Sequence, residues 1–126
     1  MLIHLILPHP ISTNKAYAWY PRRHKSKEYV EWEREAEKAM RTQTKYSIEG
    51  DEWLSMTYIL YTPLYCKNGK KKKIDIANYE KTTTDFLCHH IPWLEDHKIL
   101  TFTGIKKEVD DKGKRIEIFI EEVWSP

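Results

Sequence analysis

The sequence predicts an α+β fold in a single domain, with the order β-α-β-α-β-β, one mixed sheet and two helices. A chain of 126 residues is long enough for one hydrophobic core and too short to divide. Its 40% hydrophobic and 13% aromatic content exceeds that of disordered chains. Segments with strand periodicity also alternate with segments of helical periodicity, so residues 1–126 are treated as one domain.

The first half of the chain predicts a strand, a long loop and a helix. Residues 2–7 are a short apolar run that ends at a proline, which is typical of a buried strand. Residues 8–25 are rich in proline and polar turn formers, so we expect a loop there. Ser26 can cap a helix whose apolar residues recur at helical spacing, and this helix is expected to end near Thr42.

The second half predicts a strand, a second helix and two final strands. Residues 53–62 alternate in the pattern of a strand, and a lysine-rich loop follows them. A helix is expected from about Ala77 to His89, although its three consecutive threonines are poor helix formers. The segments 99–109 and 115–123 flank DDKGK and are expected to pair as a hairpin with a glycine turn.

The charge of the chain is locally separated, although the net charge is only +2. Basic residues concentrate at 21–27 and 67–73, and acidic residues concentrate at 28–37, 95–96 and 108–111. A basic patch beside acidic residues indicates a local binding site and not a protein surface that is basic throughout.

The sequence predicts no export signal and no membrane span. Residues 1–10 are apolar, but they lack a basic leading region and are interrupted by Pro8 and Pro10. No run approaches the roughly 20 apolar residues of a membrane helix. Cys66 and Cys88 lack the dense spacing of a secreted disulfide scaffold, so a cytoplasmic location is expected.

The stretch from Gly69 to His90 brings lysines and carboxylates together. Asp75 precedes the second expected helix, where free N–H groups and the helix dipole favour anions. Asn78, Lys81 and Asp85 follow at i, i+3 and i+7, so they share one helix face.

Glu95 and Asp96 lead into the next expected strand. The connection from the helix to this strand can place Glu95 and Asp96 near Asp75 only if the strand runs beside the helix. Converging carboxylates bind Mg²⁺, which activates water and steadies a leaving oxygen. A lysine can stabilise charge on the phosphate, and flanking lysines can contact the DNA backbone. This pattern is that of a metal-dependent nuclease.

Each of these features also has a simpler interpretation. A run of lysines is often a solvated loop, and Asp75 alone can be a helix cap. Lys81 and Asp85 can form a surface ion pair worth a few tenths of a kcal/mol. Glu95 and Asp96 are ordinary residues for a turn.

Other chemistries find less support in the sequence. The soft metal ligands have no zinc-finger spacing, and a buried thiol is the simpler role for Cys88. These ligands are Cys66, Cys88, His89, His90 and His97. A glycine-rich phosphate loop and a nucleophile elbow are both absent from the sequence, so no nucleotide cofactor and no serine or cysteine hydrolase are expected.

Three ordered segments carry a family resemblance. They are LPHPISTNKAY at 7–17, DIANYEKTTTDFL at 75–87 and WLEDHKI at 93–99. They are similar to the motifs L-P-x-P-x-S-x-N-x-x-Y, D-x-D-N-x-x-K-x-x-x-D-x-L and [WL]-x-D-D-x-x-[VI]. On these motifs, which span nearly the whole chain in order, the protein resembles the RusA family of Holliday junction resolvases.

The resemblance implies a RusA-like fold and a known activity. Members are small endonucleases of phages and prophages, so the chain would act in the cytoplasm of a bacterial host. It would use Mg²⁺, with Mn²⁺ as a substitute, to place paired symmetric nicks in four-way DNA junctions. A homodimer fits this reaction, because two nicks on opposed strands need two sites related by a twofold axis.

The resemblance also assigns roles to residues. Asp75 and Asp96 would be metal-binding catalytic carboxylates, Glu95 would stand at the adjacent acidic position and Lys81 would be the catalytic lysine. Asn78 would contact DNA on the same helix face, which Asp85 would support. The other DNA contacts would come from Asn14, Lys15, Arg22, Arg23, Lys70, Lys71, Lys72 and Lys73.

One position departs from the family pattern. Ala77 stands where the motif has its second aspartate, at a catalytic position. A methyl group cannot ligate a metal, so we expect weak Mg²⁺ binding and impaired cleavage. Either the position was changed deliberately to inactivate the enzyme, or this branch rebuilt its site with Glu95. We favour the first, because every surrounding motif residue still fits. The alternative function is a branched-DNA-binding protein without catalysis.

Overall fold

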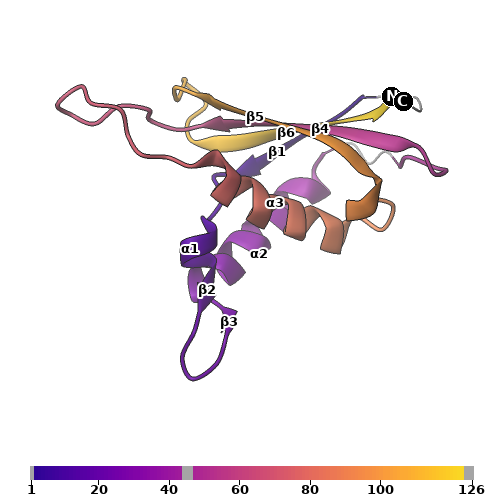
Figure 1. Ribbon diagram of the computed structural model, residues 1–126, viewed down its shortest axis with the longest axis horizontal. Helices are drawn as coiled ribbons and strands as arrows, with labels where there is room; N and C mark the ends of the chain where they lie inside the picture. The colour runs from indigo at the N-terminus through magenta and orange to yellow at the C-terminus, as the bar shows by residue number, and fades with distance from the viewer. Residues whose placement is uncertain (1, 44–46, 124–126) are drawn as a thin grey trace.

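The computed structural model describes residues 2–43 and 47–123, and it confirms a single α+β domain (Figure 1). The elements in chain order are β1 (Leu2–Pro8), α1 (Thr13–Ala16), β2 (Tyr17–Ala18), β3 (His24–Lys25), α2 (Lys27–Arg41), β4 (Trp53–Tyr61), α3 (Ile76–His90), the 3₁₀ helix η1 (Asp96–Lys98), β5 (Ile99–Lys107) and β6 (Arg115–Val123). None of the helices in the described ranges has the length and apolar character needed to cross a membrane.

The main sheet has the strand order β1-β6-β4-β5 and is mixed, as predicted. β4 pairs in parallel with β5 and antiparallel with β6, and β6 also pairs antiparallel with β1. The helices α2 and α3 lie on one side of this sheet (Figure 1). The single domain therefore has a sheet layer and a helical layer.

The core lies between these two layers. Every second residue of β1, β4 and β6 points into it, as the twofold periodicity of strands requires. Tyr29, Trp32 and Ala36 of α2 pack against these residues, together with Phe86 and Leu87 of α3. The strand residues in this core are Ile3, Leu5, Leu7, Leu54, Met56, Tyr58, Leu60, Ile116, Ile118 and Ile120.

The helix α2 begins after the cap that the sequence predicts, and α3 begins at Ile76, one residue before the expected Ala77. The Ser26 hydroxyl accepts a hydrogen bond from the Tyr29 N–H at 3.2 Å, and α2 ends with Thr42 as its C-terminal cap. The three threonines of α3 are all buried. Thr82 donates to the Ile11 carbonyl at 2.6 Å, and Thr83 donates to the Tyr79 carbonyl at 2.8 Å. These bonds and burial outweigh the low helix propensity of threonine.

The predicted C-terminal hairpin is wrong. β5 and β6 are not neighbours, because β4 lies between them. The β4-α3-β5 segment forms a crossover that places β5 in parallel beside β4. The connection 108–114 then carries the chain past β4, with Gly113 turning at a φ of 83°.

The predicted loop at 8–25 is also more ordered than expected. It contains the short helix α1, and β2 pairs with β3 in a small antiparallel sheet. The described chain therefore has a third α-helix and a second sheet in addition to the predicted elements.

Arg115 organises a charged cluster on the sheet. Its guanidinium donates to both carboxylate oxygens of Asp110, at 2.6 and 2.9 Å, and to Glu117 at 2.7 Å. It also lies 3.7 Å from the centre of the Tyr61 ring. The hydrogen bond from Arg115 lowers the pKa of Asp110 to about 2. Burial opposes ionisation of Glu117, but bonds from Arg115 and His4 outweigh it and lower the pKa of Glu117.

Replacing Arg115 with methionine should weaken the fold most at neutral pH. Both carboxyls have lowered pKa values in the folded state, so they stabilise it above their ordinary pKa. For Asp110 that contribution is lost as the pH falls from its ordinary pKa of 3.8 towards 2. Urea unfolding should show a lower midpoint for Arg115→Met at pH 7 and a smaller difference between variant and parent near pH 2. An equal difference at both pH values would contradict the coupling, and Lys114→Met is the control.

Candidate functional site

The first turn of α3 is built around Asp75. This residue is the N-cap of the helix, and its Oδ1 accepts the Ala77 N–H at 3.1 Å. The cap interpretation of Asp75 is therefore confirmed. The side chains of Asp75 and Ala77 are both exposed, so they share one accessible surface at the helix N-terminus.

The early segment packs directly against this turn. The Thr13 hydroxyl of α1 donates to Asn78 Oδ1 at 3.1 Å, and Thr82 reaches back to Ile11. Asn14 and Lys15 are exposed on α1. The first and second sequence motifs, more than sixty positions apart, thus form one structural unit.

Lys81 and Asp85 lie one turn apart on the exposed face of α3. Their charged groups are 4.0 Å apart, and the side chains are 70% and 51% exposed. An ion pair this open contributes little to stability. Lys81 therefore keeps its ammonium accessible on the same helix as Asp75.

The third motif lies near the other end of α3. Glu95 is the N-cap of η1, and its carboxylate is 3.3 Å from His97 Nε2 and 3.8 Å from Lys98 Nζ. Burial raises the pKa of the Cys88 thiol to about 11, and the negative charge of Asp96 adds to this shift. Asp96 is the first residue of η1, which follows the C-terminal end of α3, whereas Asp75 caps its N-terminal end. A helix of 15 residues is about 20 Å long.

The strand β5 does run beside α3, but it brings other residues to the Asp75 end. A Cβ on Gly104 would lie 3.2 Å from Cδ1 of Ile76, so a glycine here permits the close packing of strand and helix. Lys106 Nζ donates to the Ile74 carbonyl at 2.9 Å. Sequence reasoning missed Lys106, because its place beside Asp75 depends on the register of β5 opposite Leu60.

Glu80 is a second residue that sequence reasoning missed. It is half-buried on α3, and burial raises the pKa of its carboxyl. Its charge also acts on Tyr58 in the middle of the sheet. Its place one residue before Lys81 gives no signal of its burial, because adjacent residues of a helix point in different directions.

The carboxylates do not form a complete metal site as they lie. Within residues 2–43 and 47–123, no group of three or more His, Cys, Asp or Glu side chains is placed to hold a metal ion. Asp75, Glu95 and Asp96 are therefore not gathered at one point, and the donor set does not fit a metal held by this chain alone. The same finding removes structural support from the zinc alternative in the described ranges.

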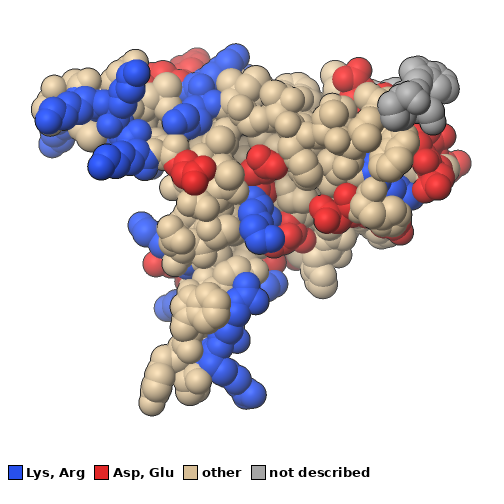
Figure 2. Space-filling model, viewed as in Figure 1, with Lys and Arg blue, Asp and Glu red and all other residues tan. Residues whose placement is uncertain are grey.

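A lysine loop, residues 64–74, projects from the sheet beside α3 (Figure 1). A bridge between Tyr65 and Lys71 closes it, and Gly69 turns its tip at a φ of 84°. Lys70, Lys71, Lys72 and Lys73 are all exposed, and blue side chains gather on this projection in Figure 2.

The second projection is the arm, residues 17–25, which contains β2 and β3 (Figure 1). It extends away from the helical layer and carries the exposed Arg22 and Arg23. In Figure 2 the lysine loop projects to the left and the arm points downward, and acidic side chains lie in the region between them over α3. Two basic projections therefore flank an acidic centre.

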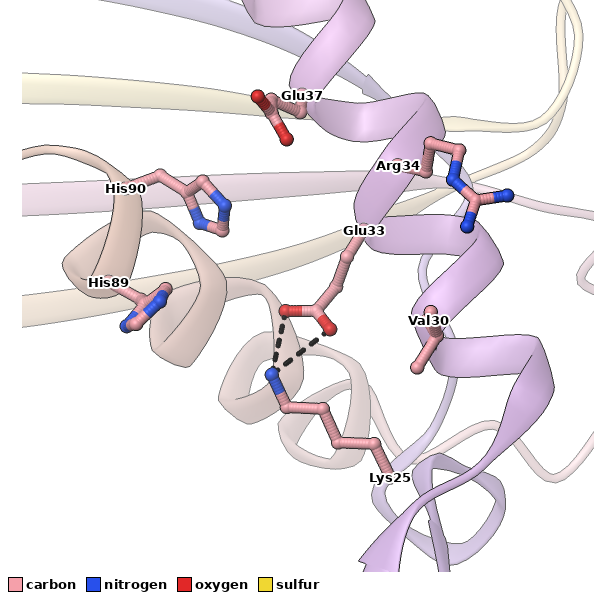
Figure 3. A pocket seen from close by; sticks show the side chains of 7 residues that line it. All are labelled: Lys25, Val30, Glu33, Arg34, Glu37, His89 and His90. Carbon is pink, nitrogen blue, oxygen red and sulfur yellow. Dashed lines mark hydrogen bonds and ion pairs between the residues drawn. The ribbon is translucent and has the colours of Figure 1, made fainter.

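A groove separates α2 from the end of α3 (Figure 3). Lys25, at the base of the arm, lies 3.1 Å from both carboxylate oxygens of Glu33. Side chains of both charges line the groove, so it does not form a uniform anion or cation site. The lining residues are Lys25, Val30, Glu33, Arg34, Glu37, His89 and His90.

Comparison with known proteins identifies the family. The family model described as Endodeoxyribonuclease RusA matches residues 8–121. No curated protein matches the chain. The match runs from the first motif through most of β6, and it covers α1, the arm, the lysine loop and α3. The chain belongs to the RusA endodeoxyribonuclease family.

Proposed function

We propose that this protein binds four-way DNA junctions as a Holliday junction resolvase, and that the chain with Ala77 cleaves them poorly. The observation that carries the proposal is the placement of Asp75 and Ala77. They lie on the exposed first turn of α3, between two basic projections, in a member of a DNA endonuclease family.

The lysine loop supports a role in phosphate binding. Its four consecutive lysines are exposed, and no carboxylate among the described residues pairs with them. Such lysines attract the DNA backbone without reading its sequence. Lys15 and Asn14 of α1 and the arginines of the arm extend this surface to the other side of Asp75.

The acidic centre supports the proposed cleavage chemistry. Asp75, Glu95 and Asp96 are the candidate ligands for Mg²⁺ or Mn²⁺, but they do not gather at one point within the described part of the chain, so Asp75 is the ligand proposed at the start of α3. Such an ion, when bound, would polarise the phosphate and activate water. Lys81 is exposed and paired only weakly, so its ammonium is free to approach a DNA phosphate. The side chain of Ala77 offers no oxygen at the helix N-terminus, so it adds no ligand beside Asp75.

A non-catalytic branched-DNA-binding protein is the second candidate. Two observations favour it: Ala77 has a methyl group where the family motif has an aspartate, and the carboxylates do not gather at one point within the described residues. Both candidates bind junctions, so only cleavage separates them.

A mobility-shift titration tests the proposed substrate. A four-way junction and a linear duplex of the same sequence should be compared in EDTA, so that binding is measured without cleavage. We expect a preference for the junction of about tenfold or more, since the junction offers phosphates to both projections. Equal affinity for the two DNAs would argue for a general DNA-binding protein and against this function.

We also propose that the active form is a homodimer. Two nicks on opposed strands require two active sites related by a twofold axis. Sedimentation of the complex with one junction should give the mass of two chains. A saturated complex with a single chain would contradict the dimer, whatever the outcome of the binding test.

A further inference from the structure

The arm exposes two large aromatic side chains that the phosphate-binding surface does not use. Trp19 is 70% exposed and Tyr20 is 89% exposed, although most other aromatic residues in the described ranges are buried or half-buried. Neither side chain has a hydrogen-bond partner among the described residues. Their exposure leaves flat apolar surface at the end of a projection (Figure 1).

The base of the arm is firmly anchored, so its tip has a defined position. The Ser26 N–H donates to the Ala16 carbonyl at 2.8 Å, and the Ser26 hydroxyl donates to the Lys15 carbonyl at 2.7 Å. The ring of Tyr17 packs edge-on against the buried Tyr29 at 5.8 Å. The ion pair of Lys25 with Glu33 adds a further attachment to α2 (Figure 3).

An arginine organises the aromatic surface of the arm. The guanidinium of Arg23 lies 3.9 Å from the centre of the Tyr17 ring and 5.4 Å from that of Trp19. Stacked arginine and aromatic planes of this kind are surfaces on which nucleic-acid bases also stack.

The charge of the arm itself fits a polyanion, while the acidic residues of α2 begin at Glu28, next to its base. Residues 1–27 contain five lysines and arginines and no aspartate or glutamate. Positive charge alone would attract an acidic protein as well as DNA, but the exposed rings beside Arg22 add flat surfaces on which nucleic-acid bases stack. The arrangement therefore favours a nucleic acid with bases available for stacking.

We propose that Trp19 and Tyr20 stack on bases at the branch point of the DNA, where the stacking of base pairs is interrupted. This inference rests on the proposed function, because it assigns the arm a role on the same branched substrate. Stacking tolerates any base sequence, so the arm would contribute recognition of branch structure and not of sequence.

The test uses two four-way junctions that carry the fluorescent base 2-aminopurine. In the first junction the probe is at the branch point, and in the second it lies one helical turn away, within one of the four DNA duplexes. The unmodified chain should change the fluorescence of the first probe only. Trp19→Ala and Tyr20→Ala should each remove most of that change and weaken junction binding about tenfold, with duplex binding and its salt dependence unaltered. Trp19→Phe should retain most of the signal, because phenylalanine also stacks.

Trp53→Ala is the control, since Trp53 is a partly exposed tryptophan on β4, outside the arm. It should leave the fluorescence change intact. Normal binding and a normal fluorescence change in Trp19→Ala and Tyr20→Ala would overturn this inference and leave the proposed function standing. The variants could instead lose the dimer while the remaining complex keeps its fluorescence change. That result would show that the arm contacts the second subunit and not the DNA bases, and it would also overturn this inference. Failure of the unmodified chain to bind any junction would overturn the proposed function itself.

Discussion

Replacing Ala77 with aspartate is expected to raise Mg²⁺-dependent cleavage of a four-way junction by about a hundredfold or more. The new carboxylate would stand at the helix N-terminus, two residues after Asp75, and add an oxygen ligand beside Asp75 at the position where the family motif has an aspartate. A metal ion contributes several kcal/mol to stabilising the transition state, and about 1.4 kcal/mol corresponds to tenfold in rate. Initial rates on an end-labelled junction measure the effect.

The position accepts this change without disturbing the core. Ala77 is exposed, so an aspartate displaces no packed side chain. A carboxylate in the first turn also interacts favourably with the helix dipole, which offsets part of its repulsion by Asp75. The melting temperature of Ala77→Asp should therefore remain close to that of the parent.

Ala77→Asn provides a matched control, because asparagine has the shape of aspartate without its charge. It should bind Mn²⁺ no better than the parent, whereas Ala77→Asp should bind it more tightly in calorimetric titration. If Ala77→Asp gains neither metal affinity nor cleavage, residue 77 does not limit the reaction, and the non-catalytic function is favoured.

Replacing Lys70, Lys71, Lys72 and Lys73 together with glutamine should cause the largest loss of DNA binding. Each phosphate contact contributes about 0.9 to the slope of log affinity against log salt. Removing four contacts should therefore lower the slope by about 3.6. Between 50 and 200 mM salt the parent should then lose roughly a hundredfold more affinity than the variant.

A charge-matched control separates the loop from the net charge of the chain. Lys38 and Arg41 lie on α2 and pair with neighbouring glutamates on the same helix. The double variant Lys38→Gln with Arg41→Gln should change the salt slope much less than Lys70→Gln with Lys71→Gln. Equal effects of the two double variants would show that binding follows net charge and not the lysine loop.

Local signals explain what the sequence predicts correctly. Ser26 caps α2, and Asp75 caps α3, because capping requires only side chains and backbone close in the chain. The buried strands were also recognised, since alternation along one strand reports its two faces directly. The resemblance to the family motifs indicated which of the exposed residues between these elements are candidate site residues.

Long-range pairing explains the errors. The turn chemistry of DDKGK predicts a hairpin, but the crossover through α3 places β5 on the far edge of β4. The position of Asp96 depends on the same crossover, since β5 brings Lys106 to the start of α3. The arm was missed because its ribbon has only two residues in each strand, too few to show a period.

Mapping the cleavage products of Ala77→Asp tests the central claim most directly. A four-way junction labelled in turn on each strand is incubated with the variant in Mg²⁺, and the cut positions are read on a denaturing gel. We expect two nicks at symmetric positions on opposed strands, little cutting of linear duplex, and little cutting by the parent chain. An uncut junction, or equal cutting of junction and linear duplex by the variant, would contradict it.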